Sequence, residues 1–155
     1  MHGPITPCFT EYPGHATILT RQALGEGADQ IIAVGGDGTV NEVVNGWFVN
    51  DQPINPETSM SVLMCGFGCD FQRSLVPEAF VHPTPEGNPS ETKQIDVGKM
   101  TFRDESDGSS VRYYANIGSL GLSGEVDRFL MRHLNLKQLG GKVLFLYATL
   151  IQLLR

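Results

Sequence analysis

Hydrophobic and polar positions fall into blocks with two different periods over the first 75 residues. Apolar residues recur at helical spacings over residues 14–25 and again over 40–49. The apolar runs at 30–34 and 60–64 are instead short and continuous, as in strands that are buried on both faces of a parallel sheet. Residues 5–10 form a shorter, β-like run. The pattern therefore predicts alternating strands and helices.

Glycines follow each of the two continuous runs. GGDGT comes after the first run and GFGCD after the second, and FQRSLV then begins as a helix would. Two repeats of strand, glycine turn and helix indicate right-handed crossovers on a parallel sheet, which binds its ligands beyond the carboxyl ends of the strands. The predicted fold class is α/β.

The pattern changes after residue 75. Residues 76–93 are rich in Pro, Glu and Ser and predict a loop. QIDVGKMTF and VRYYANIGSL then predict an antiparallel strand pair joined by the polar segment RDESDGSS. GGKVLFLYATLIQLLR is apolar around most of a helix, so this helix needs partners on several sides. We place a boundary near Gly98, with an α/β domain over 1–98 and the beginning of a β-rich second domain, ending in the hydrophobic helix, over 99–155.

Composition narrows the class of protein. The chain has 155 residues, of which 41% are hydrophobic and 18% charged, so it can bury a core. Its net charge of -6 argues against nucleic-acid binding through a broad basic face. We expect a cytoplasmic protein, since the sequence shows neither a secretory opening nor an apolar run of about 18 residues. The three cysteines predict free thiols rather than disulfides or metal ligands.

The glycines of GGDGT suggest a phosphate-binding turn. At the end of a buried strand, Gly35, Gly36 and Gly38 are free to adopt positive φ and to let backbone N–H groups approach a ligand. The start of the following helix favours an anion at the same place. From these residues alone, a tight turn that leads into an ordinary helix remains the alternative reading.

Acidic and hydroxyl side chains surround this turn. A carboxylate at Asp37 would repel phosphate unless a hard divalent ion such as Mg²⁺ lay between them. Thr39 is predicted to cap the helix or to contact phosphate. Glu42, three residues later, would complete a capping box.

The longer motif GGDGTVNEVVNG resembles the diacylglycerol kinase catalytic domain, whose family includes diacylglycerol, sphingosine, ceramide and bacterial lipid kinases. GGDGT alone is shared with NAD kinases and phosphofructokinases, but the NEVVNG continuation disfavours an NAD kinase. The segments FTEYPGHAT, GFGCDFQRSL, QIDVG, YYANIGSLGLSGEV and LGGKVLFLYATLIQLL resemble further parts of the family in the same order. The resemblance implies a parallel-sheet nucleotide-binding domain of the NAD kinase and diacylglycerol kinase type.

The resemblance also implies a function and a site. The γ-phosphoryl group of ATP would be transferred to the hydroxyl of a lipid such as diacylglycerol, with Mg²⁺ required. Three acids would form a catalytic group that holds the metal directly or through water, namely Asp37, Asp70 and Asp96. The nucleotide would be contacted by Thr10, Gly35, Gly36, Asp37, Gly38, Thr39, Gly66, Phe67 and Gly68, with Glu42 steadying the loop.

Departures from the family pattern define the alternative. The second loop of the family reads Gly-Thr-X-Asn-Asp, whereas this chain has Phe67 and Cys69 at the threonine and asparagine positions. Phe67 donates no hydrogen bond, a contact worth about 0.5–1.5 kcal/mol. The family also has a strand before residue 1 and a second domain that continues beyond residue 155. We therefore expect a partial catalytic domain with weak or no lipid phosphorylation alone. The alternative function is a nucleotide-binding module without transfer activity.

Other side chains and partners leave two readings each. His15 is either a local helix cap or a phosphate contact, and Asn116 either reaches the acids or satisfies its own strand. Trp47 and Phe48 are predicted to lie in the core. The identity of the lipid, transient contact with a membrane surface and self-association through the apolar carboxyl-terminal helix stay open.

Overall fold

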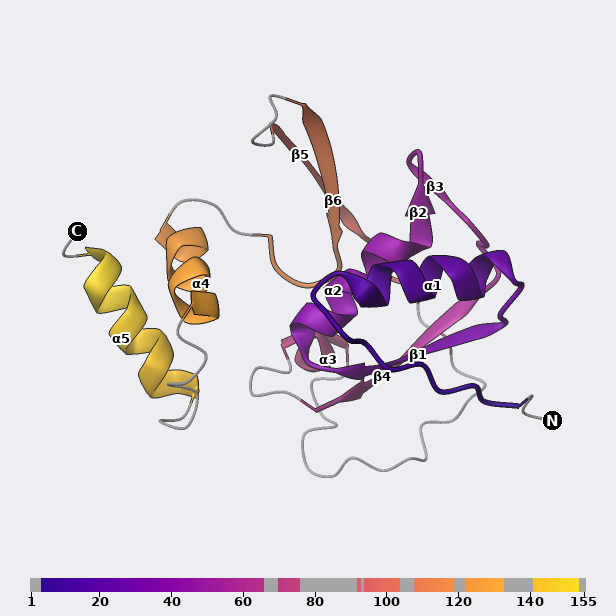
Figure 1. Cartoon of the computed structure of the whole chain (residues 1–155), viewed down its shortest axis with the longest axis horizontal. Coiled ribbons are helices and arrows are strands. Elements are labelled where there is room, and N and C mark those ends of the chain that lie inside the picture. The colour runs from indigo at the N-terminus through magenta and orange to yellow at the C-terminus, as the bar shows by residue number, and fades with distance from the viewer. Residues whose placement is uncertain are drawn as a thin grey trace. The chain divides into compact units, whose positions relative to one another are not determined.

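The computed structural model describes residues 4–65, 70–75, 92, 94–103, 108–118, 122–132 and 141–153. The chain divides into two compact units, Met1–Asn116 and Ile117–Arg155 (Figure 1). The helices are α1 (His15–Gly25), α2 (Asp37–Trp47), α3 (Asp70–Leu75), α4 (Leu122–Arg132) and α5 (Gly141–Leu153). The strands are β1 (Gln30–Gly35), β2 (Phe48–Val49), β3 (Gln52–Pro53), β4 (Ser59–Met64), β5 (Gly98–Arg103) and β6 (Ser109–Tyr114).

Strands β1 and β4 form the predicted parallel pair. Their register runs from Gln30 opposite Ser59 to Gly35 opposite Met64. Helices α1 and α2 cover one face, where Ala16 of α1, Ala33 of β1 and Val43 of α2 make one buried cluster. This arrangement confirms the α/β fold class and brings the carboxyl end of β1 to the start of α2 (Figure 1).

The other face of the β1–β4 pair is exposed. Ile32, Val34 and Leu63 keep 38%, 59% and 56% of their surface accessible. The prediction that these strands are buried on both faces is therefore wrong for this structure. The physical reason is that α1 packs beside α2 on the same face of the sheet.

A close contact between backbones joins α1 and α2. Gly46 is buried, and a Cβ atom at this position would lie 2.6 Å from the backbone oxygen of Thr17 and 2.6 Å from Cβ of Thr20. Glycine is required here because any side chain would separate the two helices. The carboxyl-terminal half of α2 is thus held tightly against α1.

Helix α2 is shorter at its end than the apolar pattern predicts. It ends at Trp47, and the residues that follow form β2 of a small antiparallel hairpin with β3. The two residues of the hairpin turn, Asn50 and Asp51, have φ of 50° and 64°. Two successive positive φ angles are typical of a type I′ turn, which Asn and Asp tolerate better than most residues. Trp47 and Phe48 pack against the two core clusters as predicted.

Strands β5 and β6 form the predicted antiparallel pair. Gly98 lies opposite Tyr114, whose ring covers it so closely that a Cβ atom at Gly98 would lie 2.7 Å from Cε1. Residues 5–10, by contrast, form no strand and are exposed. That prediction was wrong: within the described part of the chain, nothing pairs with this segment.

The two compact units differ from the two predicted domains. The β5–β6 hairpin belongs to the first unit, because Tyr113 and Ala115 pack against the core that contains Val40 and Val44. The described residues of the second unit form α4 and α5, with Val126 and Ala148 buried. Helix α5 confirms the predicted apolar helix, whereas α4 follows a stretch predicted as strand, and no β-rich domain appears in the described part of this unit.

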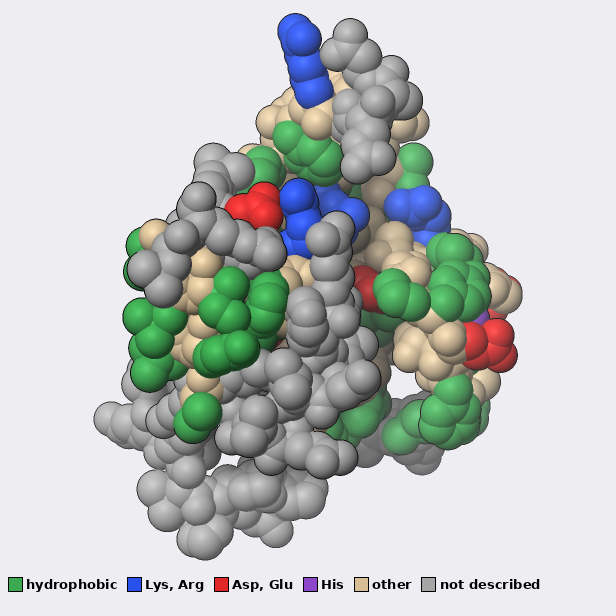
Figure 2. All heavy atoms as spheres, turned by 60° about the vertical axis from the view of Figure 1, so that its left-hand side comes forward, with side chains coloured by type: hydrophobic (Ala, Val, Ile, Leu, Met, Phe, Trp, Pro, Cys, Tyr) green, Lys and Arg blue, Asp and Glu red, His purple; other side chains and the backbone are tan. Residues whose placement is uncertain are grey.

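Helix α5 exposes much of its apolar surface. Six large side chains are at least half accessible, namely Val143, Phe145, Leu146, Tyr147, Leu150 and Leu153. Figure 2 shows hydrophobic side chains reaching the molecular surface at several places. Within the described residues, no helix is both long and apolar enough to cross a membrane.

Candidate functional site

Helix α2 begins directly after the glycine turn, and its start is open. Its N-cap is Gly36, with φ of -93° and ψ of -173°, and no side chain in the described part of the chain caps it. The first backbone N–H groups of a helix have no intrahelical acceptor, and they favour an anion. This end of α2 can therefore accept a phosphate group through its backbone.

The glycines serve the turn in different ways. At Gly35, with φ of 159°, a Cβ atom would lie 2.8 Å from Cβ of Thr39, so the threonine packs against the turn. At Gly38, a Cβ atom would have no heavy atom within 4 Å, so nothing in the described residues obstructs approach there. The expectation of successive positive φ angles is wrong for Gly36 and Gly38. Both follow the ordinary geometry of a helix start.

Asp37 points toward α3 rather than over the start of its own helix. Its Oδ1 accepts hydrogen bonds from the Phe71 backbone N–H at 3.0 Å and from Asn116 Nδ2 at 3.3 Å. Its Oδ2 accepts from the Asp70 backbone N–H at 3.4 Å. Three N–H donors thus hold the carboxylate in place on the side of α3. The contact from Asn116 also confirms the reading in which this side chain reaches an acid.

The three predicted acids are placed differently. Asp70 begins α3 beside Asp37, and its side chain is exposed, while Asp96 is an exposed residue before β5. Among the residues that the structure describes, no three His, Cys, Asp or Glu side chains could hold a metal ion together. The residues present do not fit a preassembled carboxylate metal centre. The acidic metal group therefore stays a prediction.

Glu42 caps α1 instead of α2. Its Oε1 accepts from the Gly14 backbone N–H at 2.8 Å and its Oε2 from the Ala16 backbone N–H at 3.1 Å. The backbone oxygen of Glu42 accepts from Thr17 Oγ1 at 2.8 Å. The predicted capping box is wrong, because α2 begins at Asp37 and Thr39 already lies in its first turn. A carboxylate from α2 thus fills the anion-favouring start of α1.

The other predicted contacts lie before α1 or outside the described residues. Thr10 is exposed in an irregular segment. The contacts of His15 are local, since its Nδ1 accepts from the Glu11 backbone N–H at 3.1 Å, before the start of α1, and its ring stacks on Tyr12. The second loop, with the positions Gly66, Phe67 and Gly68, lies outside the described residues.

Sequence reasoning missed Asn45. Its Nδ2 donates to the backbone oxygens of Asn41 and Tyr113, both at 2.7 Å, and its Oδ1 accepts from the Tyr113 backbone N–H at 2.9 Å. The amide thus binds the edge of β6 as a neighbouring strand would. The signal was present in the sequence, since Asp37, Asn41 and Asn45 repeat every four residues and form a polar stripe on α2.

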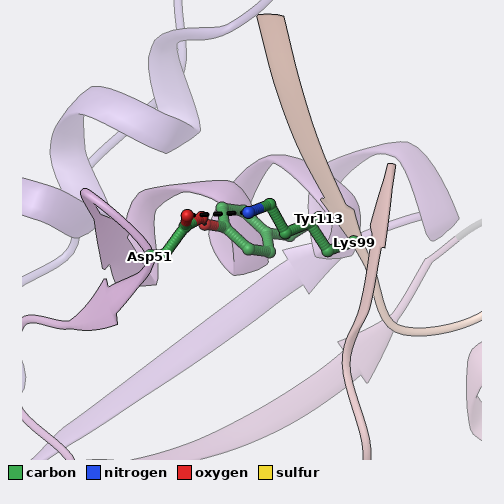
Figure 3. Close-up of polar contacts among 3 residues, drawn as sticks. All are labelled: Asp51, Lys99 and Tyr113. Carbon is green, nitrogen blue, oxygen red and sulfur yellow. Dashed lines mark hydrogen bonds and ion pairs between the residues drawn. The ribbon is translucent and has the colours of Figure 1, made fainter. Parts of the chain in front are cut away.

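A second missed cluster joins the β2–β3 turn to the β5–β6 hairpin. Lys99 and Tyr113 lie opposite each other on β5 and β6, and both reach the Asp51 carboxylate (Figure 3). Lys99 Nζ lies 2.7 Å from Oδ2, and the Tyr113 hydroxyl donates to Oδ1. Hydrogen bonds from Lys99 and Tyr113 lower the pKa of Asp51. The bond to Asp51 raises the pKa of Tyr113.

Comparison with known proteins agrees with the longer motif. A sequence profile described as the diacylglycerol kinase catalytic domain matches residues 4–100. A protein named diacylglycerol kinase from Staphylococcus haemolyticus (strain JCSC1435) is 39% identical over 95 residues, which cover 61% of this chain and 28% of the relative. A protein of the same name from Staphylococcus aureus (strain JH9) is 37% identical over 95 residues, which cover 61% of this chain and 29% of the relative. No solved structure gives a significant match.

Proposed function

This chain belongs to the diacylglycerol kinase catalytic domain family, and from that membership we propose that it binds ATP and serves transfer of the γ-phosphoryl group to a lipid hydroxyl. The aligned part of the chain spans less than a third of the length of the relatives it matches. The proposal therefore covers only the part of the reaction to which these residues contribute.

One observation supports the nucleotide half of the proposal most directly. The start of α2 has no side-chain cap among the described residues, and it lies inside the segment that matches the family profile. Gly38 leaves space for close approach. Backbone N–H groups at Gly36, Asp37 and Gly38 would donate to phosphate oxygens. The side chain of Thr39 packs against Gly35 of the turn.

Acidic side chains would lie near the phosphate groups of the nucleotide. Asp37 is held by Asn116 and by the start of α3, so its position is fixed before any ligand binds. Positioning and charge stabilisation account for most catalysis of phosphoryl transfer. Mg²⁺ is proposed here only as the ion that accompanies ATP and neutralises the charge of its phosphates, while metal binding by Asp37, Asp70 and Asp96 together stays a prediction.

Calorimetry with MgATP tests nucleotide binding. We expect the chain to bind MgATP and Asp37→Asn to bind it more weakly. Asp51→Asn is the matched control, because it removes one carboxylate from an exposed turn outside the site. Absence of binding to the folded wild-type chain would overturn the proposal.

A transfer assay then identifies the acceptor class. γ-Labelled ATP is offered with diacylglycerol, sphingosine or NAD, and we expect any label that is transferred to appear on a lipid and none on NAD. Label on NAD would contradict the lipid assignment. Binding without transfer to any acceptor would favour the nucleotide-binding module instead.

A further inference from the structure

Asn116 connects the end of β6 to the acid of the glycine turn. It lies just beyond Tyr114, the last residue of the strand, and its Nδ2 lies 3.3 Å from Asp37 Oδ1. The same carboxylate oxygen accepts the Phe71 backbone N–H at 3.0 Å. Asn116 and the start of α3 thus hold Asp37 from two sides.

The side-chain amide of Asn116 is held in position by the strand that carries it rather than by a full set of its own hydrogen bonds. Its Oδ1 is buried and has no hydrogen-bond partner within the described part of the chain. A buried acceptor without a partner costs free energy, so some other part of the structure must hold it in place. The candidate is the segment that carries it.

Asn45 holds that segment at Tyr113, three residues before Asn116. Its side chain both donates to and accepts from the Tyr113 backbone, at 2.7 and 2.9 Å. The ring of Tyr113 also stacks on Phe48, with ring centroids 4.3 Å apart. These contacts fix the height of β6 along α2 and therefore the level at which Asn116 meets Asp37.

We propose that Asn116 is a positioning residue for Asp37, and that Asn45 sets Asn116 in place through the backbone of Tyr113. Neither residue needs to touch substrate for this role. Both asparagine contacts involve the same helix, because Asp37 is the first residue of α2 and Asn45 lies close to its last residue, Trp47. The contact between Asn45 and Tyr113 near the end of α2 thus sets the position of β6, and with it the position of Asn116 beside Asp37 at the start of α2.

Hydrogen exchange at Phe71 provides the test, because its amide bonds to the Asp37 oxygen in question. The amide of Cys65, which donates to the Gly35 oxygen at 2.8 Å, serves as reference in the same molecule. In Asn116→Leu we expect Phe71 exchange to rise about tenfold relative to Cys65, the scale of one lost hydrogen bond. In Asn45→Leu we expect a change in the same direction, although the side-chain hydrogen bonds of Asn45 within the described residues go to Asn41 and Tyr113 rather than to α3.

Two further variants separate positioning from general loosening. Combining Asn45→Leu with Asn116→Leu should give no more exchange at Phe71 than Asn116→Leu alone, because both act through one contact. Thr17→Val is the matched control, since it also removes one hydrogen bond to α2; it should leave the ratio of Phe71 to Cys65 unchanged. If Asn45→Leu does not fold, Asn45→Asp replaces it, because it keeps the acceptor for the Tyr113 N–H and loses the donors.

Faster exchange at Tyr113 with an unchanged Phe71 ratio in the Asn45 variant would overturn the proposal. The same holds if Thr17→Val raises the Phe71 ratio as much. The exchange test needs no nucleotide, whereas the consequence for catalysis rests on the proposed function. If the chain binds MgATP, both asparagine variants should weaken binding and Thr17→Val should not; a chain that fails to bind MgATP refutes the function and leaves the exchange result standing.

Discussion

The two ends of helix α2 contrast sharply. At its end, Asn45 pairs with the backbone of β6, Gly46 packs against the backbone of α1, and Phe48 stacks on Tyr113. At its start, the described residues provide no side-chain cap, and the space around Gly38 is open.

The two ends of α2 therefore have different roles. Helix ends without partners cost free energy, so an uncapped start needs support from elsewhere in the fold. The closed end of α2 supplies that support, and the open end keeps its N–H groups for a ligand. Asn116 links the two, because the strand held at the closed end carries it back to Asp37.

A glycine-to-alanine substitution at each end of α2 should show this contrast most strongly. Gly46→Ala places a Cβ atom against the backbone of α1, and we expect the free energy of unfolding to fall by about 1–3 kcal/mol. Gly38→Ala enters open space and should raise it by up to about 1 kcal/mol through the entropy of the unfolded chain. Denaturant unfolding measures both, and equal effects at the two positions would contradict the contrast.

Glu42 offers a test of what an open helix start can bind. Glu42→Ala exposes the start of α1, and we expect a loss of about 0.5–2 kcal/mol in unfolding free energy. Glu42→Gln should lose less, because it keeps an acceptor. Sulfate should then stabilise the alanine variant more than the wild type, since a free anion replaces the missing carboxylate. Equal stabilisation of the two proteins by sulfate would show that α1 gained no anion site.

The Asp51 cluster should give the smallest effect, because its groups are exposed. The pKa of Asp51 is lowered, so its stabilisation is present above the ordinary carboxyl pKa of about 4 and is lost as pH falls through the lower folded value. The pKa of Tyr113 is raised, so its share is present below about pH 10 and is lost as pH rises through the higher folded value.

We therefore expect the stability difference between wild type and Asp51→Asn to be constant between these limits and to shrink outside them. Asn tolerates the positive φ of this turn, which makes the variant a clean probe of charge. Thermal unfolding across pH, repeated at high salt, measures the difference. A difference that persists unchanged in strong acid would mean that the carboxylate charge plays no part.

The sequence predicted elements whose cause is local. Continuous apolar runs identified β1 and β4, and the glycines that follow the first run located the turn before α2. The family resemblance through residue 46 came from the same stretch, and the profile match confirms it. Short-range patterns carried this information because strand burial and helix periodicity repeat within a few residues.

Contacts between distant segments were not predicted correctly. Glu42 was expected to cap its own helix, but it caps the start of α1 through the backbone N–H groups of Gly14 and Ala16, which lie 28 and 26 residues before it in sequence. Asn45 reaches Tyr113 across 68 residues. Such partners depend on how helices and strands pack, and single-chain periodicity does not encode that. The three-acid group stays a prediction for the same reason, since each acid comes from a different segment.

Backbone NMR of the glycine turn tests the central claim most directly. The account predicts that MgATP shifts the amide resonances of Gly36, Asp37 and Gly38, that adenosine does not, and that the amides of Gly14 and Ala16, already bound to Glu42, stay in place. Shifts confined to residues away from the start of α2, or equal shifts with adenosine, would contradict it.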